Sequence, residues 1–101
     1  MEVVNKARFD ELCAKGTVVV DFYADWCGPC KMLGPVMEEV AKEYPDITFV
    51  KVNCDEEEEL AAQFSIMSIP AVYMVKGGQT VARFIGLQSK STVQSFIENN
   101  K

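Results

Sequence analysis

Histidine is absent from the 101-residue chain. Its absence excludes every catalytic pair of a cysteine with a histidine and every zinc site built from two cysteines and two histidines. Thiols, carboxylates and amines are therefore the groups left for chemistry, and the chain has four cysteines to supply the thiols.

Basic residues are scarce as well, because 10 lysines and arginines stand against 15 aspartates and glutamates and leave a net charge of −5. A protein that binds the phosphates of a nucleic acid needs a basic surface that displaces counterions. We therefore expect no nucleic-acid partner. Since no apolar run is long enough to span a bilayer, we expect no membrane partner either.

No linker, repeat or low-complexity segment divides the chain. Its length and its 49% content of hydrophobic residues fit one globular domain over residues 1–101 that buries a single core. Residues 1–12 include acidic residues and no continuous apolar region, so they do not predict a secretory signal. We expect a cytoplasmic monomer in a reducing compartment, where a disulfide is transient.

Hydrophobic periodicity predicts an α/β fold, with a central mixed sheet and helices on both of its faces. Runs rich in β-branched and aromatic residues predict strands at residues 17–24, 47–53, 71–76 and 79–85. Apolar residues at helical spacing predict one helix after Asn5, a long one from the cysteines Cys27 and Cys30 to Tyr44, and a closing one around residues 93–97. The last two strands flank Gly77-Gly78, which predicts the two-residue turn of a hairpin.

An acidic run at residues 55–59 opens a further segment with helical spacing. Asp55 and Glu58 have the spacing of a capping box, in which two side chains bond backbone N–H groups at the start of a helix. The run is therefore predicted to be the solvated start of a helix rather than a ligand site.

Two cysteines form the reactive motif, between the first strand and the helix that follows it. Cys27 and Cys30 are three positions apart on the first helical turn, close enough to form a disulfide with little movement. The helix N-terminus favours a thiolate at the exposed first position, so Cys27 is predicted to be the nucleophile and the less exposed Cys30 the resolving thiol. Half of a zinc site, or two buried thiols, are the alternatives for this spacing. Cys13 is predicted to belong to the core, and the role of Cys54 stays open.

Residues 26–31 read WCGPCK, and around this motif the whole sequence resembles the thioredoxin family. Further marks of that family are Asp21-Phe22, Pro35, the segments 51–53 and 68–70, and the segment that begins at Ile85. The resemblance implies the thioredoxin fold and a dithiol carrier that reduces the disulfides of substrate proteins. It also implies that electrons come from NADPH through a thioredoxin reductase, with no bound cofactor and no metal.

The resemblance implies roles for individual residues as well. Cys27 matches the attacking cysteine of the family, Cys30 the resolving cysteine, and Pro70 a cis-proline that faces the disulfide. An apolar surface that docks the substrate polypeptide is matched by Trp26, Gly28, Pro29, Ile69, Pro70, Gly86 and Leu87. Substrate preference stays open, because the chain departs from residues common in the family at Tyr23, Ala71 and Cys54.

Asp21 lies inside a predicted buried strand, where an ionised carboxylate without a partner is costly. Burial is expected to raise its pKa, and Lys51 on the adjoining strand is the candidate opposing influence. The resemblance implies that Asp21 accepts the proton of Cys30, through water, when that thiol becomes a nucleophile. The alternative is a carboxyl group that is hydrogen-bonded for packing alone.

Two hypotheses for function follow from the motif. The first is the disulfide reductase that the resemblance implies. The second is a non-catalytic module of the same fold, which binds a partner through the apolar surface or a metal through its thiols. Consumption of NADPH in the presence of a thioredoxin reductase and a disulfide substrate distinguishes the two.

Overall fold

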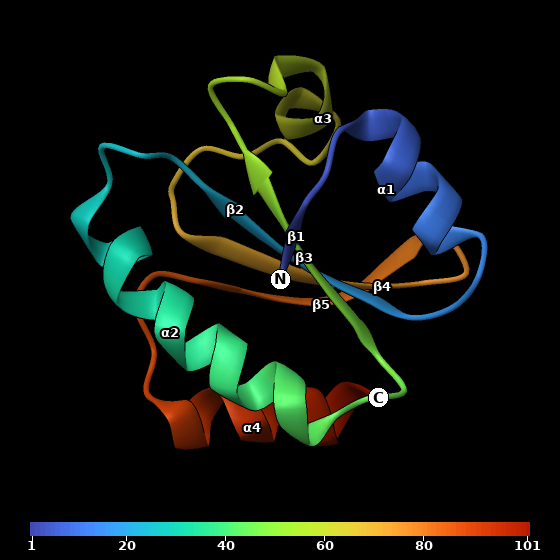
Figure 1. Ribbon diagram of the computed structural model, residues 1–101, viewed down its shortest axis with the longest axis vertical. Helices are drawn as coiled ribbons and strands as arrows, with labels where there is room; N and C mark the ends of the chain where they lie inside the picture. Colours follow the sequence, from blue (N-terminus) through green and yellow to red (C-terminus); the bar gives the residue numbers. More distant parts are fainter.

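Five strands form one mixed sheet in the computed structural model, which describes residues 1–101 (Figure 1). The strand order is β1-β3-β2-β4-β5, in which β1 and β2 run parallel to β3, β4 is antiparallel to β2, and β5 is antiparallel to β4. The strands span Glu2–Val3 (β1), Val18–Tyr23 (β2), Thr48–Asn53 (β3), Ala71–Lys76 (β4) and Gln79–Ile85 (β5). The predicted α/β class with a mixed sheet is confirmed.

Four helices cover the two faces of this sheet. They span Lys6–Cys13 (α1), Gly28–Glu43 (α2), Glu58–Gln63 (α3) and Lys90–Asn100 (α4). Figure 1 shows α1 and α3 on one side of the sheet and α2 and α4 on the other. None of the helices combines the length and the apolar composition that crossing a membrane requires.

The central strand β2 supplies side chains to both hydrophobic cores. Val18, Val20 and Phe22 pack in the core with residues of α1 and α3. Val19 packs in the other core, with residues of α2 and α4. Because successive side chains of a strand point to opposite faces, Asp21 lies on the face that α2 and α4 cover. A carboxyl group is thus placed beneath the helix that begins at the two cysteines.

Local signals in the sequence account for most of these elements. The predicted helix after Asn5 is α1, and the Asn5 side chain accepts the backbone N–H of Arg8 at 2.9 Å. The predicted hairpin turn is Gly77-Gly78, whose φ angles of +57° and +80° favour glycine. The strand β1 was not predicted, because two exposed residues carry no periodic pattern and only their pairing with β3 defines them.

The predicted capping box at Asp55 is wrong. Helix α3 begins at Glu58, and its N-cap side chain makes no capping hydrogen bond. Asn53 accepts the backbone N–H groups of residues 55–57, through its side chain or its carbonyl, and so holds the chain in a turn before the helix starts. The Asp55 carboxylate instead accepts the indole N–H of Trp26 at 2.8 Å.

Replacing the cap residue of α1 tests the local account of the fold. Asn5→Ala removes the acceptor for the N–H of Arg8, and we expect it to lower the free energy of unfolding by about 1 kcal/mol. Asn5→Ser keeps an acceptor and should stay close to the wild type. Urea denaturation of the three proteins gives the comparison, and equal midpoints for Asn5→Ala and the wild type would contradict it.

Candidate functional site

Cys27 and Cys30 lie where β2 gives way to α2. Cys27 is the N-cap residue of α2, its backbone N–H donates to the carbonyl of Ala24 at 3.2 Å, and Pro29 occupies the first turn, where no intrahelical N–H bond is needed. The two cysteines form a disulfide with a Cα–Cα distance of 5.3 Å. The Sγ atom of Cys27 accepts the backbone N–H of Cys30 at 3.2 Å. This sulfur therefore occupies the place at the helix N-terminus where a thiolate is favoured.

The expected difference in exposure between the two cysteines is wrong for this disulfide state. Cys27 and Cys30 are each 5% exposed. The cause is packing, because both cysteines and Ala24 form a small cluster against Tyr23 and Ile69. Their position on the helix, rather than their exposure, is what distinguishes the two sulfurs here.

A second loop faces the disulfide from β4. The Sγ atom of Cys27 lies 3.9 Å from the carbonyl oxygen of Ile69, and the Ile69–Pro70 peptide bond is cis. The carbonyl of Pro70 accepts the backbone N–H of Gly86 at 2.8 Å, and Gly86 has a φ of +90°, a conformation that favours glycine. Residues 69–70 therefore lie beside Cys27, and the hydrogen bond from Gly86 holds the segment 86–87 next to them.

Exposed apolar side chains belong to the same segments. Trp26 is 72% exposed and Leu87 43%, while Gly28 and Pro29 are exposed between the cysteines. Pro70 is buried and Ile69 is half-buried. Sequence reasoning missed two exposed methionines, Met32 just after Cys30 and Met67 just before Ile69. Met32 directly precedes Leu33, a buried residue of α2, and Met67 lies outside every helix and strand, so no periodic pattern identified them as surface residues.

Asp21 is 1% exposed, and neither of its carboxylate oxygens has a hydrogen-bond partner in the protein. Burial raises its pKa to about 6, while the charge of Lys51 acts in the opposite direction. The predicted direction and both of its causes are confirmed. The alternative was a carboxyl group that is hydrogen-bonded for packing alone, but no residue bonds either oxygen of Asp21. The free-energy cost of burying this carboxyl group is therefore not offset by a hydrogen bond within the protein.

Lys51 is the neighbour of Asp21 in the parallel register of β2 and β3. It makes no ion pair within 4.0 Å, and its ammonium group lies 4.5 Å from the centre of the Tyr23 ring. The lysine therefore influences the carboxyl group through its charge and not through a direct contact.

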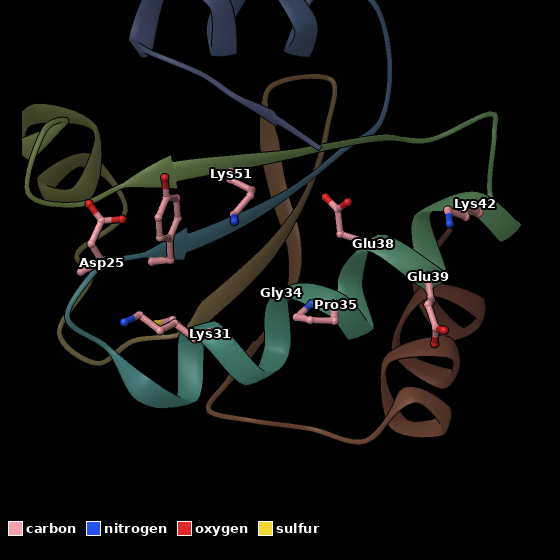
Figure 2. A pocket seen from close by; sticks show the side chains of 11 residues that line it. Asp25, Lys31, Gly34, Pro35, Glu38, Glu39, Lys42 and Lys51 are labelled. Atoms are coloured by element: carbon pink, nitrogen blue, oxygen red, sulfur yellow. The ribbon is translucent and has the colours of Figure 1, made fainter.

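A groove of about 620 Å³ beside α2 brings Cys30 and Lys51 to one surface (Figure 2). Figure 2 shows Lys51 reaching from β3 toward α2, and Glu38 reaching from α2 toward the strands. The Glu38 carboxylate accepts a hydrogen bond of 2.6 Å from the N-terminal ammonium group of Met1. The groove is lined by Tyr23, Ala24, Asp25, Cys30, Lys31, Gly34, Pro35, Glu38, Glu39, Lys42 and Lys51. The inner cysteine thus lies in one groove with polar side chains of α2, of β3 and of the loop after β2.

The other two cysteines are not disulfide-bonded. Cys13 is buried in the core as predicted, and burial raises the pKa of its thiol. Cys54 is half-buried, and burial, followed by the charges of Asp55 and Asp21, raises its thiol pKa. Both thiols are therefore less readily ionised than an ordinary cysteine. No group of three or more cysteine, aspartate or glutamate side chains is placed to hold a metal ion.

Comparisons with known proteins agree on one family. Residues 1–99 match the family model described as thioredoxin. The chain is 39% identical over 100 residues to a thioredoxin of Chlamydia pneumoniae, and the aligned region covers 99% of this chain and 98% of the relative. It is 41% identical over 101 residues to a thioredoxin of Chlamydia trachomatis serovar D, covering 100% and 99% of the two chains.

Solved structures give the same result. The thioredoxin of Plasmodium falciparum superposes with a TM-score of 0.92 at 36% identity and covers 98% of both chains. The thioredoxin of Fasciola hepatica superposes with a TM-score of 0.93 at 36% identity and covers 100% of both chains. The similarity therefore extends over the whole sheet and all four helices.

Replacing Asp21 tests the cost of burying the carboxyl group. Its pKa lies above the ordinary value of 3.8, so the folded protein binds the proton more tightly, and stability falls as the pH rises from 3.8 through about 6. Asp21→Asn removes this fall. The variant should gain up to roughly 3 kcal/mol on the wild type between about pH 4 and about pH 8.

Denaturation midpoints of both oxidised proteins across this pH range measure the gain, because no thiol of the Cys27–Cys30 pair titrates in the disulfide state. A constant difference between the two proteins at all pH values would contradict the raised pKa.

Proposed function

Because the chain belongs to the thioredoxin family and is a dithiol–disulfide oxidoreductase, we propose that it reduces protein disulfides with Cys27 as the attacking thiol and Cys30 as the resolving thiol. The observation that carries the proposal is the Cys27–Cys30 disulfide at the N-terminus of α2. Breaking and reforming this bond needs only a short movement within one helical turn, so both redox states can share one fold.

In the first step, the thiolate of reduced Cys27 attacks one sulfur of a substrate disulfide. The substrate S–S bond breaks, a mixed disulfide forms between Cys27 and the substrate, and the second substrate sulfur leaves as a thiolate that takes up a proton. The N-terminal dipole of α2 and the N–H of Cys30, which points at this sulfur, favour the attacking thiolate.

In the second step, Cys30 loses its proton and attacks the Sγ atom of Cys27. The mixed disulfide breaks, the first substrate sulfur leaves and takes up a proton, and the Cys27–Cys30 disulfide results. Two electrons have then passed to the substrate. Asp21 is the proposed proton acceptor for Cys30, through water, because a carboxyl group with a pKa of about 6 can exchange protons near neutral pH. Lys51 favours the ionised form of Asp21, which is the form that accepts the proton.

The surface around the disulfide docks the substrate polypeptide in this proposal. An extended segment can pair with the backbone near Ile69, as a strand pairs with a sheet edge, and this carbonyl already lies beside Cys27. The remaining contacts come from apolar or backbone groups of Trp26, Gly28, Pro29, Pro70, Gly86 and Leu87. These segments lie on both sides of Cys27, so a docked chain can present its sulfur to the nucleophile.

The cycle closes when a thioredoxin reductase returns two electrons from NADPH to the disulfide. The protein itself then needs no bound cofactor, because its two sulfurs carry the electrons. We expect it to act as a monomer in the cytoplasm, a reducing compartment in which the disulfide is opened after each turnover.

An assay of NADPH oxidation tests this function. The protein is mixed with a thioredoxin reductase, NADPH and a protein that contains a disulfide, and loss of NADPH is followed with and without the substrate. We expect continuous oxidation that needs all components and that is abolished in Cys27→Ser. Absence of turnover, together with stoichiometric binding of zinc to the reduced protein, would support the metal-binding module instead.

The order of attack has its own test. Cys30→Ser should accumulate a covalent mixed disulfide with a substrate protein, because a serine hydroxyl cannot displace the bound sulfur. Cys27→Ser should trap far less. Non-reducing gels and mass spectrometry of the adducts identify the bonded cysteine, and the double variant Cys27→Ser/Cys30→Ser gives the background from Cys13 and Cys54. Equal trapping by the two single variants would contradict the assignment of Cys27 as the attacking thiol and Cys30 as the resolving thiol.

A further inference from the structure

Arg83 lies on β5, the outer strand of the sheet, and is exposed. The other arginine of the chain, Arg8, forms ion pairs with Glu2 and Glu11. Arg83 forms no ion pair, and the only hydrogen bond of its side chain within the protein is donated to the hydroxyl group of Tyr73 at 3.3 Å. Because a guanidinium group has five N–H donors, most donors of Arg83 have no partner in the protein.

Tyr73 restrains this arginine from the core. Tyr73 is 5% exposed, and its hydroxyl group donates to the carbonyl of Phe64 at 3.3 Å. The phenol is therefore fixed by packing and by a backbone group, and it accepts one N–H of Arg83. A guanidinium group held at one nitrogen has less conformational freedom to lose when a partner bonds the other nitrogens.

A hollow of about 170 Å³ lies beside the Arg83 side chain. Sites for whole small molecules usually measure about 300–1,000 Å³, so this hollow suits a single side chain of a larger partner. Ser65 and Ser68 are exposed in its lining, and their hydroxyl groups can donate to an anion. The hollow is lined by Ser65, Ile66, Met67, Ser68, Ala71, Tyr73, Arg83 and Ile85.

The hollow adjoins the two segments at which a substrate docks in the proposed function. Ser68 directly precedes Ile69, and Ile85 directly precedes Gly86. The carbonyl oxygen of Ile69 lies 3.9 Å from the Sγ atom of Cys27. Because an extended chain advances about 3.3 Å per residue, a substrate side chain a few residues from the reacting cysteine can reach the hollow.

We propose that Arg83 is a specificity-determining residue, which binds the carboxylate of an aspartate or glutamate close to the reacting cysteine of the substrate polypeptide. The inference rests on the proposed function, in which this polypeptide pairs with the backbone near Ile69. A planar guanidinium group binds a carboxylate through two parallel N–H bonds, which a lysine cannot reproduce. The preferred substrates are therefore disulfides that have an acidic residue beside the cysteine.

Charge complementarity supports this choice of partner. The chain carries a net charge of −5, so its surface as a whole repels an acidic polypeptide. An arginine without an ion pair supplies a local attraction, and this attraction acts where the proposed docking segments meet β5. A charged side chain on an outer strand also discourages pairing with a second sheet, but that role alone predicts no preference among substrates.

The test uses the full chain, reduced beforehand so that no reductase takes part. The substrates are short peptides whose single cysteine forms a mixed disulfide with 2-pyridinethiol. One series carries glutamate at successive positions before and after the cysteine, and a matched series carries glutamine at the same positions. The thiolate of Cys27 attacks the peptide sulfur, the S–S bond breaks, and the pyridinethiolate leaves and takes up a proton as neutral pyridinethione. Cys30 then releases the peptide thiol, and absorbance of the pyridinethione gives the second-order rate constant.

Within each protein, the ratio of the rate constants for the glutamate peptide and its glutamine partner is compared, so differences in intrinsic reactivity cancel. We expect a ratio of about two to five for the wild type at the best position, the factor of an exposed ion pair. Arg83→Ala should bring the ratio to about one, and Arg83→Glu should bring it below one, because like charges repel. The best position also shows in which direction the substrate chain runs.

Lys76→Gln is the matched control. Lys76 ends β4, forms no ion pair and does not line the hollow. This variant removes one positive charge from the same hairpin, and it should keep the wild-type ratio.

Three results would overturn the inference: a wild-type ratio of one at every position, a ratio above one that persists in Arg83→Ala, or a loss in Lys76→Gln as large as in Arg83→Ala. The last result would assign the preference to overall charge. The proposed function fails separately, if the wild type reacts with the glutamine peptides no faster than Cys27→Ser does.

Discussion

The meeting of a buried strand with a helix N-terminus is the constraint on which the site depends. β2 lies between β3 and β4 and packs against helices on both faces, so its carboxyl end has little freedom. Cys27, the N-cap residue of α2, lies four residues beyond that end. The dipole and the free N–H groups of the helix then act on the first sulfur, while the next turn holds the second within bonding reach. The α2/α4 core keeps the helix in this place.

The same strand carries the cost of the arrangement. Alternation along β2 turns Asp21 toward α2, and no protein group bonds its oxygens. Burial raises the pKa of Asp21 to about 6, so the ionised carboxylate lowers the free energy of unfolding at neutral pH. Lys51 relieves only part of this cost, because its ammonium group lies over the Tyr23 ring and not on the carboxylate. A group that a stable fold would avoid is typical of a functional site, and the proposed transfer of a proton from Cys30 to Asp21 gives this carboxyl group a function.

Local reading of the sequence predicted the strands from β2 onward from their β-branched and aromatic runs, the hairpin from Gly77-Gly78, and the helices α1, α2 and α4 from apolar residues at helical spacing. It could not predict β1, whose two exposed residues form a strand only through pairing with β3. It also misplaced Asp55, because the local capping pattern competes with an acceptor site for Trp26, 29 residues away. The burial of Cys27 depends on Ile69, 42 residues away. The motif itself was readable from sequence, whereas such contacts between distant loops are set by the tertiary fold.

Alkylation of the reduced protein as a function of pH tests the central claim most directly, namely that the N-terminus of α2 makes Cys27 the reactive thiol. Iodoacetamide is added in limiting amount, and mass spectrometry of peptides measures the labelling rate of each cysteine. We expect Cys27 to be labelled first near neutral pH, with a midpoint below that of an ordinary thiol, while the raised thiol pKa of Cys13 and of Cys54 keeps the labelling of these two cysteines slow. Labelling of Cys30 or Cys54 ahead of Cys27 would contradict it.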